Sequence, residues 1–406
     1  MYVDWHREKG PAARFVPNPD GDAGNVPNCV GTCCAMTSRE RVLTAMRRGQ
    51  ADRVPINIRG ARVWDEEWVA TRDHSYRPLI DAVREHCDVI PVAGVGGADA
   101  HFLATATAEM AETLVIDAGD WDINRTIIHT AQGDLTQDYW VSKLGDLPLT
   151  KKHFVVTPED AERALSVPYV MPELDFSGYF ELRDDWPDNC VMCMCPQAGE
   201  IVHDLLGTET FAYWWVEHRD LLFALRAVFE ERALAVLDTM LSADVGPVLA
   251  TNGVEQVAPP IHSAETYRAF ALPPFREICR RIHEAGCLLH VHCHNRVSAL
   301  LEDFAEVGID ALHPLEPPPM GDVDLAEAKR RVGDRICLEG NIQIGELYAA
   351  PTEHVIALVT EAMRAGKPGG GFILCPSASP YTPTLSHQTV ANYLAMIETA
   401  VKMREY

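Results

Sequence analysis

Short apolar runs alternate with amphipathic helical patterns along most of this chain, and this alternation constrains its fold more than any other feature. The runs that predict strands are Val54–Ile58, Val89–Ala93, Cys190–Met194, Gly246–Ala250, Cys287–Cys293, Asp310–Leu315, Arg335–Leu338 and Gly371–Cys375. Helical patterns such as residues 264–286 and 351–366 separate the last five runs. Strands that alternate with helices imply a parallel sheet, and eight of them imply a closed (β/α)8 TIM barrel of the α/β class.

An open doubly wound sheet is the alternative architecture. Its dinucleotide-binding version needs a glycine-rich phosphate loop after the first strand, and no such loop follows Val54–Ile58. The stretch between the second and third strands is too long for one crossover. Within it, residues 124–142 alternate in polarity on both sides of Gly133 and Asp134, which predicts an inserted β-hairpin.

Residues 1–36 are rich in Gly, Pro, Asn and Asp and show no sustained period, so we interpret them as an N-terminal extension. The globular pattern begins at Thr37, because Thr37 and Glu40 have the spacing of a capping box at the start of the helical residues 40–49. No linker or internal repeat interrupts the rest of the sequence. Residues 37–406 are therefore expected to form one barrel domain.

Composition excludes several classes of protein. The chain has no apolar run long enough to cross a bilayer, and its first residues lack the apolar core of a secretory signal. Its 12 cysteines are scattered, which is typical of reduced thiols and predicts a cytoplasmic protein. A formal net charge of −24 repels nucleic-acid phosphates and anionic membranes, so neither is expected as a partner.

The active sites of β/α barrels form at the carboxyl ends of the strands. These ends are rich here in side chains that bind metals and substrates. The residues at these ends that could bind a metal or a substrate are Arg59, Arg62, Gln197, Asn252, Glu255, His292, His294, His313, Glu316, Glu339, Asn341, Cys375 and Ser377.

The segment LHVHCHN, residues 289–295, contains the densest group of metal-ligand types. Side chains alternate along a strand, so His290, His292 and His294 share one face while Cys293 points the other way. Imidazole is a common zinc donor, and we predict His292 and His294 as metal ligands, with His290 too deep in the barrel to join them. The alternative is a set of hydrogen-bonded pocket histidines without a metal.

The third ligand is open between a thiol and a carboxylate. Cys375 ends the last predicted strand and is our choice, although a free cysteine is often a small buried hydrophobe. Glu255, Glu316 and Glu339 compete for the same role. Glu339 is alternatively a partner that orients a ligand imidazole. By contrast, residues 190–195 (CVMCMC) lie where a buried strand is needed, so we expect their cysteines in the core.

Three segments resemble the uroporphyrinogen decarboxylase superfamily, namely LHVHCHN, residues 311–343 and residues 369–380. Residues 36–56 are similar to the usual start of these proteins, so the resemblance runs from about residue 36 to the end. The superfamily includes the decarboxylase itself and zinc-dependent, corrinoid-linked methyltransferases. The resemblance thus implies a barrel enzyme.

The decarboxylase branch holds substrate propionates with two arginines of an early motif. The matching stretch here, PINIRGARVW, keeps Arg59 and Arg62 at a shorter spacing. The catalytic aspartate of that branch has no counterpart in residues 89–97, VIPVAGVGG. The resemblance therefore argues against decarboxylation of a tetrapyrrole.

The methyltransferase branch binds zinc through a His-x-Cys on the fifth strand and a later cysteine after the eighth. In this chain His292 keeps the histidine, and His294 stands where the first cysteine is expected. Ala378 stands in the place of the second cysteine, and Cys375 lies three residues earlier. A site with fewer thiolates is harder, which suits a substrate other than a thiol or a metal other than zinc.

We interpret the chain as an enzyme, a metal-dependent methyltransferase or demethylase. Zinc or another divalent ion would activate a nucleophile, with a corrinoid as methyl donor. The expected partners are a small-molecule substrate, a corrinoid protein and a second copy of the chain in a homodimer. The roles predicted from these patterns are metal binding by His292, His294 and Cys375, catalysis by Glu316, Glu339, Asn252 and Glu255, and substrate binding by Arg59, Arg62 and Asn341.

Two other functions stay open. One is a decarboxylase or another carbon–carbon lyase that grips a small carboxylate with Arg59 and Arg62, because a guanidinium pairs bidentately with a carboxylate. The other is a metal-binding protein without catalysis. The fold alone does not choose among these functions.

Overall fold

Seven parallel strands form the central sheet of the computed structural model, which describes residues 35–97, 111–144 and 148–406. The strands are β1 (Val92–Ala93), β6 (Met192–Met194), β7 (Val248–Thr251), β8 (Leu288–Cys293), β9 (Ala311–Pro314), β10 (Cys337–Ile342) and β11 (Phe372–Pro376). They are neighbours in the order of the chain, and each adjacent pair is parallel. The predicted parallel α/β architecture is therefore confirmed, and seven of the eight predicted runs contain or overlap a strand.

The predicted first strand, Val54–Ile58, pairs less regularly. Ile56 forms an isolated parallel bridge with Leu374 of β11, where the backbone N–H of Asn57 donates to the Leu374 carbonyl at 2.9 Å. On the other side, the N–H of Asp88 donates to the Ile56 carbonyl at 2.6 Å. The segment thus lies between β11 and the residues that precede β1. The closed barrel of eight regular strands stays a prediction.

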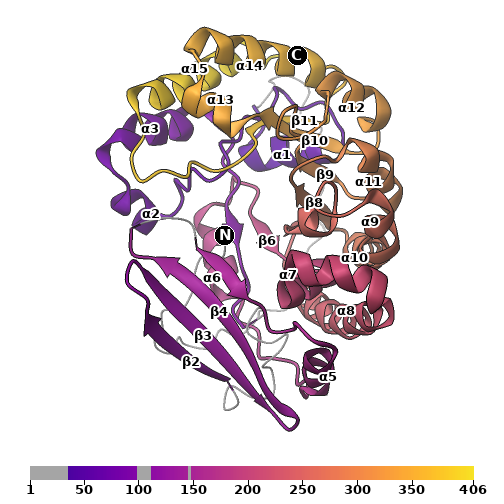
Figure 1. Cartoon of the computed structure of the whole chain (residues 1–406). Coiled ribbons are helices and arrows are strands. Elements are labelled where there is room, and N and C mark those ends of the chain that lie inside the picture. Colours follow the sequence, from indigo (N-terminus) through magenta and orange to yellow (C-terminus); the bar gives the residue numbers. More distant parts are fainter. Residues whose placement is uncertain (1–34, 98–110, 145–147) are drawn as a thin grey trace, which may run out of the picture. The chain divides into compact units, whose positions relative to one another are not determined.

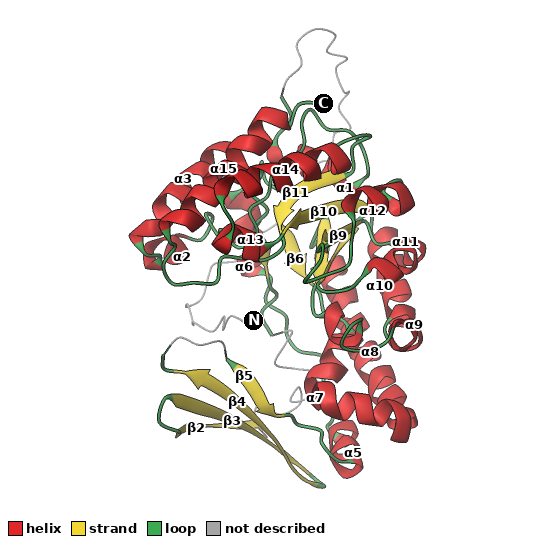
Figure 2. Cartoon of the chain, turned by 45° about the horizontal axis from the view of Figure 1, so that its top comes forward, coloured by secondary structure: helices red, strands yellow, loops and turns green. Residues whose placement is uncertain are grey.

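Helices surround the parallel strands (Figures 1 and 2). The described helices are α1 (Ser38–Met46), α2 (Glu66–Thr71), α3 (Arg77–His86), α5 (Pro158–Ser166), α6 (Ser177–Asp185), α7 (Ala198–Glu217), α8 (Arg219–Ser242), α9 (Ala264–Phe270), α10 (Leu272–Glu284), α11 (Leu301–Val307), α12 (Leu325–Val332), α13 (Ile344–Ala349), α14 (Thr352–Gly366) and α15 (His387–Met403). Short 3-10 turns are η1 (His74–Tyr76), η2 (Val254–Val257) and η3 (Ser298–Leu300). In the described part of the chain, no helix combines the length and the apolar character needed to cross a membrane.

Helix α1 begins with the predicted capping box. The Thr37 hydroxyl accepts from the N–H of Glu40 at 3.1 Å, and the Glu40 carboxylate accepts from the N–H of Thr37 at 2.9 Å. Further along the helix, Arg41 donates to the buried carboxylate of Asp88 at 2.5 Å, and Arg53 donates to the same carboxylate at 2.9 Å. These charged hydrogen bonds join α1 to two segments of the strand layer. Residues Met36–Tyr406 form one unit, and the predicted extension lies almost wholly outside the described residues.

A four-stranded antiparallel sheet replaces the simple hairpin that the sequence predicts. It consists of β2 (Ala111–Asp117), β3 (Trp121–Thr130), β4 (Gly133–Ser142) and β5 (Leu149–Lys152), in that order. The predicted hairpin is confirmed as β3 and β4, which turn between Thr130 and Gly133. Arg125 and Asp138 face each other across these strands and form two hydrogen bonds, at 2.6 and 2.7 Å.

The hydrophobic core confirms the structural interpretation of the CVMCMC segment. Cys190, Cys193 and Cys195 are buried, and burial raises the pKa of each thiol above its ordinary value. A thiol held protonated in this way is a poor nucleophile, and none of the three lies in a group of possible metal ligands among the described residues. These cysteines therefore contribute packing.

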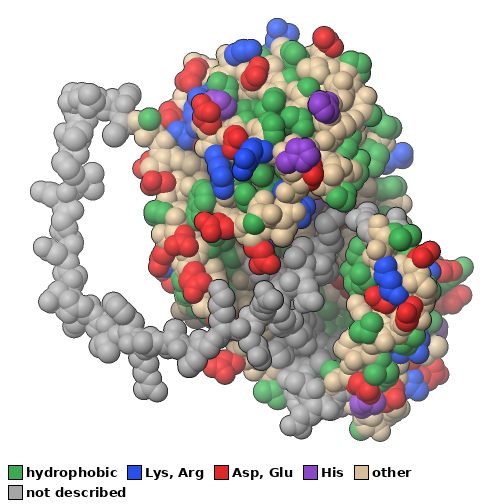
Figure 3. Space-filling view, turned by 90° about the vertical axis from the view of Figure 1, so that its left-hand side faces the viewer, with side chains coloured by type: hydrophobic (Ala, Val, Ile, Leu, Met, Phe, Trp, Pro, Cys, Tyr) green, Lys and Arg blue, Asp and Glu red, His purple; other side chains and the backbone are tan. Residues whose placement is uncertain are grey.

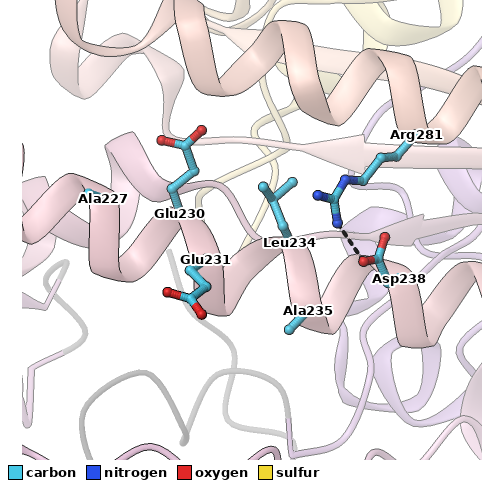
Figure 4. A pocket seen from close by; sticks show the side chains of 7 residues that line it. All are labelled: Ala227, Glu230, Glu231, Leu234, Ala235, Asp238 and Arg281. Carbon is cyan, nitrogen blue, oxygen red and sulfur yellow. Dashed lines mark hydrogen bonds and ion pairs between the residues drawn. The ribbon is translucent and has the colours of Figure 1, made fainter.

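The surface bears both signs of charge. On the face shown in Figure 3, Lys, Arg and His side chains stand among Asp and Glu. A surface hollow of about 440 Å³ runs along α8 (Figure 4). It is lined by Ala227, Glu230, Glu231, Leu234, Ala235, Asp238 and Arg281. Arg281 is paired with Asp238 there, and the lining residues belong to α8 and α10.

His203 of α7 generates a prediction about stability. Burial lowers the pKa of this imidazole to about 3, whereas the unfolded chain has the ordinary value of about 6.5. The unfolded state therefore binds more protons, so His203 destabilises the fold as the pH falls through the window between these values. Between pH 7.5 and 5 the loss should be about 2 kcal/mol from this one residue. Urea unfolding of the wild type and of His203→Gln at both pH values should show a smaller loss in the variant.

His74→Gln is the matched control, because the His74 side chain is exposed. The interpretation is wrong if His203→Gln loses as much free energy of unfolding on acidification as the wild type does.

Candidate functional site

Strand β8 carries His290 and His292, His294 follows its last residue, and β9 adds His313. His292 lies opposite His313 in the β8–β9 register, and their Nδ1 atoms are 2.7 Å apart. The rings are nearly parallel, with centroids 4.9 Å apart. His290, one layer deeper, is buried, as expected. His292 thus contacts His313, a residue that the sequence placed at a strand end but to which we assigned no role.

The hydrogen bonds of His313 determine which imidazole nitrogens carry protons. Its Nε2 lies 3.0 Å from the carbonyl oxygen of Pro376, which can only accept, so Nε2 must carry the proton. Burial lowers the pKa of both His313 and His292 well below the ordinary value, and the charge of Arg59 lowers them further. Both rings are therefore neutral. Nδ1 of His313 then accepts from His292 Nδ1–H, which leaves a lone pair on Nε2 of His292.

Glu339 of β10 places a negative charge next to these rings. The residue is 1% exposed, and its two carboxylate oxygens accept from Nε2 of His290 at 2.8 Å and from Nδ2 of Asn57 at 2.9 Å. Burial raises the pKa of Glu339, but these hydrogen bonds outweigh it and hold the pKa well below the ordinary value. The carboxylate is ionised at neutral pH.

His313, Glu339 and Cys375 form a cluster that can hold a metal ion. One ligand atom from each lies within 4.8 Å of the others, and all three side chains are buried. Elsewhere in the described residues, no other group of three or more such side chains comes this close together. Burial raises the pKa of the Cys375 thiol well above its ordinary value, so the thiol is protonated without a metal. We refer to these three residues as the His–Glu–Cys cluster.

The surroundings of the cluster fit a metal. In metal sites, a ligand histidine usually donates its second N–H to a carbonyl or carboxylate, which fixes the tautomer. His313 does this with Pro376, so a metal at its Nδ1 would take the place of the hydrogen bond from His292 Nδ1–H. The carboxylate of Glu339 is likewise held by its two donors. Imidazole, carboxylate and thiolate together are a donor set that zinc accepts.

His294 and Glu316 form a second pair beside the cluster. Nδ1 of His294 lies 3.1 Å from Oε2 of Glu316, which also accepts from the backbone N–H of Asn295 at 3.0 Å. Burial raises the pKa of Glu316, but these hydrogen bonds outweigh it and lower the pKa. The rings of His294 and His292 are 4.5 Å apart, so the pair adjoins the His–Glu–Cys cluster. The predicted ligand His294 is thus engaged by a carboxylate, and its role as a ligand stays a prediction.

The two predicted substrate-binding arginines lie in different surroundings. Arg59 follows the Val54–Ile58 segment, is half-buried, and is close enough to the cluster to lower the pKa of His292. Within the described ranges, the Arg59 guanidinium forms no ion pair. Arg62 instead pairs with Asp65 at 2.5 Å, just before α2. Arg59 alone is therefore positioned beside the cluster.

The remaining predicted residues lie around the same strand ends. Asn341 of β10 stands opposite Cys375 of β11 and is half-buried. Asn252 is exposed at the end of β7, and its carbonyl accepts from Gln197 at 3.3 Å. Glu255 of η2 is close enough to β8 to contribute to the raised pKa of Cys293 there, although less than burial does. Glu255 Oε2 is buried and has no hydrogen-bond partner among the described residues.

Sequence reasoning missed the roles of Asn57 and His313. Asn57 is the one strongly polar residue inside the apolar run VPINI, and a buried polar group needs a hydrogen-bond partner. That signal was available, but it could not indicate Glu339, which is 282 residues away. His313 was visible at a strand end, although nothing in the sequence distinguished it from His294.

Comparisons with known proteins agree with this architecture. A methyltransferase from Methanosarcina mazei superposes with a TM-score of 0.58 over 89% of this chain and 98% of that one, at 16% sequence identity. At this identity the similarity concerns the fold alone.

Two groups of sequence relatives are found. Methylcobamide:CoM methyltransferase MtaA of Methanosarcina barkeri is 27% identical over 186 residues, or 45% of this chain and 51% of that protein. The chain thus spans about half the length of this relative. Uroporphyrinogen decarboxylase of Chlorobium phaeovibrioides is 24% identical over 329 residues, or 78% of this chain and 84% of that protein.

The family comparison covers the strands that carry the site. The model of the uroporphyrinogen decarboxylase (URO-D) family matches residues 202–402, which include β7 to β11 and therefore the His–Glu–Cys cluster. The named relatives are enzymes of two kinds, a methyltransferase and a decarboxylase. Just under half of the chain, residues 202–402, is therefore similar to the uroporphyrinogen decarboxylase family.

Proposed function

We propose that this protein is a metal-dependent methyltransferase or demethylase that uses a corrinoid methyl donor. The observation that carries the proposal is the buried cluster of His313, Glu339 and Cys375, which gathers three kinds of metal ligand at the strand ends. The relative MtaA is named for methyl transfer between methylcobamide and CoM. A metal cluster at the active end of this fold suits the activation of a methyl acceptor better than it suits decarboxylation, for which the early arginine pair of the decarboxylase branch is degraded here.

The metal would be held by Nδ1 of His313, where it would displace the hydrogen bond from His292, and by the carboxylate of Glu339 and the thiolate of Cys375. This set shares Cys375 with the ligands predicted from sequence and replaces His292 and His294. When bound, a zinc ion supplies Lewis acidity that lowers the pKa of a nucleophile at an open coordination position. A barrel of eight closed strands would surround this position on all sides.

The protein's own residues prepare the site. His290 and Asn57 hold Glu339 ionised, so that a carboxylate is ready as a donor. His292 is neutral, and the lone pair on its Nε2 can accept a proton from the acceptor nucleophile. His294 and Glu316 form a second acid–base pair beside it. Arg59 would orient an anionic group of the substrate, because its charge has no ion-pair partner among the described side chains.

Metal analysis separates the two ligand sets. We expect about one divalent ion per chain and a loss of zinc affinity of at least about tenfold in Cys375→Ala, because even the partners of a metal ligand contribute this much. His294→Ala should retain the metal if His313, Glu339 and Cys375 are the ligands. Zinc content after dialysis against a competing chelator, measured by mass spectrometry, tests both variants.

Cys337→Ala is the matched control for Cys375→Ala. Both residues are fully buried thiols, in the adjacent strands β10 and β11, and Cys337 lies near the start of β10. Metal lost in His294→Ala as well as in Cys375→Ala would contradict our set and favour the ligands predicted from sequence, whereas metal kept in Cys375→Ala would contradict both sets.

Methyl transfer can be measured directly. The protein loaded with zinc should demethylate methylcobalamin, or a methylated corrinoid protein, in the presence of a suitable acceptor, which changes the corrinoid absorption. The acceptors should include thiols, amines and phenols, because a harder ligand set need not favour a thiol. His292→Gln should slow the transfer while keeping the metal, and Cys375→Ala should lose both.

Arg59 provides the test of substrate binding. Losing a charged hydrogen bond costs about 1.5–3 kcal/mol, which corresponds to roughly 10- to 150-fold in affinity. Arg59→Gln should raise the KM of an anionic substrate by this factor and leave the metal content unchanged. Arg62→Gln is the control, because Arg62 is paired with Asp65. Equal effects of the two variants would remove Arg59 from the substrate site.

A decarboxylase or another carbon–carbon lyase is the second candidate. It is favoured by Arg59, whose guanidinium could hold a small carboxylate next to the neutral imidazoles. Release of carbon dioxide from a carboxylated substrate, without methyl transfer to any acceptor tested, would establish this alternative. A protein that binds one metal ion and catalyses neither reaction would instead be a metal-binding protein.

A further inference from the structure

The two edges of the antiparallel sheet β2–β5 differ in their protection against pairing with another strand (Figure 2). The edge strand β5 has only four residues, two of them Lys151 and Lys152, and its pairing with β4 is interrupted by a register shift. Short length, lysines and irregular pairing are the usual protections of an edge. One edge of this sheet is therefore blocked.

The opposite edge strand, β2, lacks these protections. Its seven residues, AETLVID, contain no Pro, Gly or Lys, and they pair with β3 without a register shift. All seven are exposed, including the apolar run Leu114, Val115 and Ile116, of which Val115 is 68% exposed. A long, regular, apolar edge of this kind is a template for another strand.

The backbone groups available on β2 can be identified. The N–H of Ala118 donates to the carbonyl of Trp121 at 2.9 Å, so residue 118 directs its backbone toward β3. In an antiparallel pair, successive residues direct these groups alternately to one side and the other. Thr113, Val115 and Asp117 therefore direct their N–H and C=O groups away from β3, toward the edge at which no described strand pairs.

The sequence of β2 is self-complementary in an antiparallel arrangement. With Leu114 opposite Leu114 of a second copy, all seven residues are paired, and Thr113 lies opposite Val115, both with outward backbone groups. Glu112 then faces Ile116, and Asp117 faces Ala111, so no like charges are opposed. A parallel arrangement in the same register would place Glu112 against Glu112 and Asp117 against Asp117. The charges thus favour the antiparallel pairing, which has twofold symmetry and closes as a dimer.

We propose that β2 is a dimerisation edge, at which two copies of this chain pair antiparallel about Leu114 and join their two sheets into one. The occupant is a second copy, because β2 matches its own sequence in length, in backbone register and in charge. The pairing uses none of the residues of the His–Glu–Cys cluster. Because each chain carries a formal charge of −24, screening by salt should strengthen the association.

Val115→Pro tests the proposal on the full-length chain. Proline removes the outward N–H of residue 115 and adds its ring at the edge, but it removes no hydrogen bond between β2 and β3. Sedimentation equilibrium of the wild type should give twice the chain mass of 44.9 kDa. The dissociation constant should rise at least tenfold in Val115→Pro. Val115→Lys, which adds a charge without changing the backbone, should act in the same direction.

Leu149→Lys is the matched control, because Leu149 is a 39% exposed apolar residue at the protected edge of the same sheet. It should leave the dissociation constant unchanged. Hydrogen exchange adds a second measurement. The amides of Thr113 and Val115 should be protected in the wild-type dimer and exchange faster on dilution.

Two outcomes would overturn the proposal. One is a dimer that persists in both Val115 variants. The other is a wild type that is monomeric at all concentrations tested. Protection of the β2 amides in such a monomer would show that a segment of the same chain covers the edge. Fast exchange there would show that the edge is unpaired in the monomer.

Discussion

The ionised carboxylate of Glu339, buried among the parallel strands, is the interaction on which the arrangement of the site depends. A buried charge is tolerated only when hydrogen bonds replace its lost hydration. Asn57 and His290 provide these bonds from positions 282 and 49 residues away. One carboxylate therefore holds the first strand segment against β8 and β10, and any change that leaves it unpaired affects the fold and the site together.

Burial and a nearby positive charge decide the protonation of His292 and His313, close to Glu339. Burial and the nearby Arg59 keep His292 and His313 neutral, and a neutral imidazole is the form that binds metals and accepts protons. The carbonyl of Pro376 then selects the tautomer of His313. The site thus combines a fixed negative charge with lone pairs of known direction, which suits a divalent ion and a nucleophile better than it suits a tetrapyrrole with several carboxylates.

The inserted sheet obeys different rules from the parallel layer. Its β3–β4 hairpin is local, so the alternation around Gly133 is enough to predict it. Strand β2 also pairs with β3 across a short connection, because Asp117 lies opposite Asp122. It is exposed along its whole length, however, so its sequence has no alternation between a buried and an exposed face. The absence of that pattern explains why the sequence does not predict this strand.

The sequence alone determined the alternation of strands and helices, the capping box of α1, the hairpin and the set of polar residues at the strand ends, because each depends on neighbours a few residues apart. It also determined the family resemblance, which the comparisons bear out. Only the tertiary structure decided which of those polar residues meet. His313, Glu339 and Cys375 come from three different strands, and the register between strands brings their side chains within 4.8 Å. Periodicity along one strand contains no information on that register, so the sequence could group the histidines of LHVHCHN but could not bring His313, Glu339 and Cys375 together.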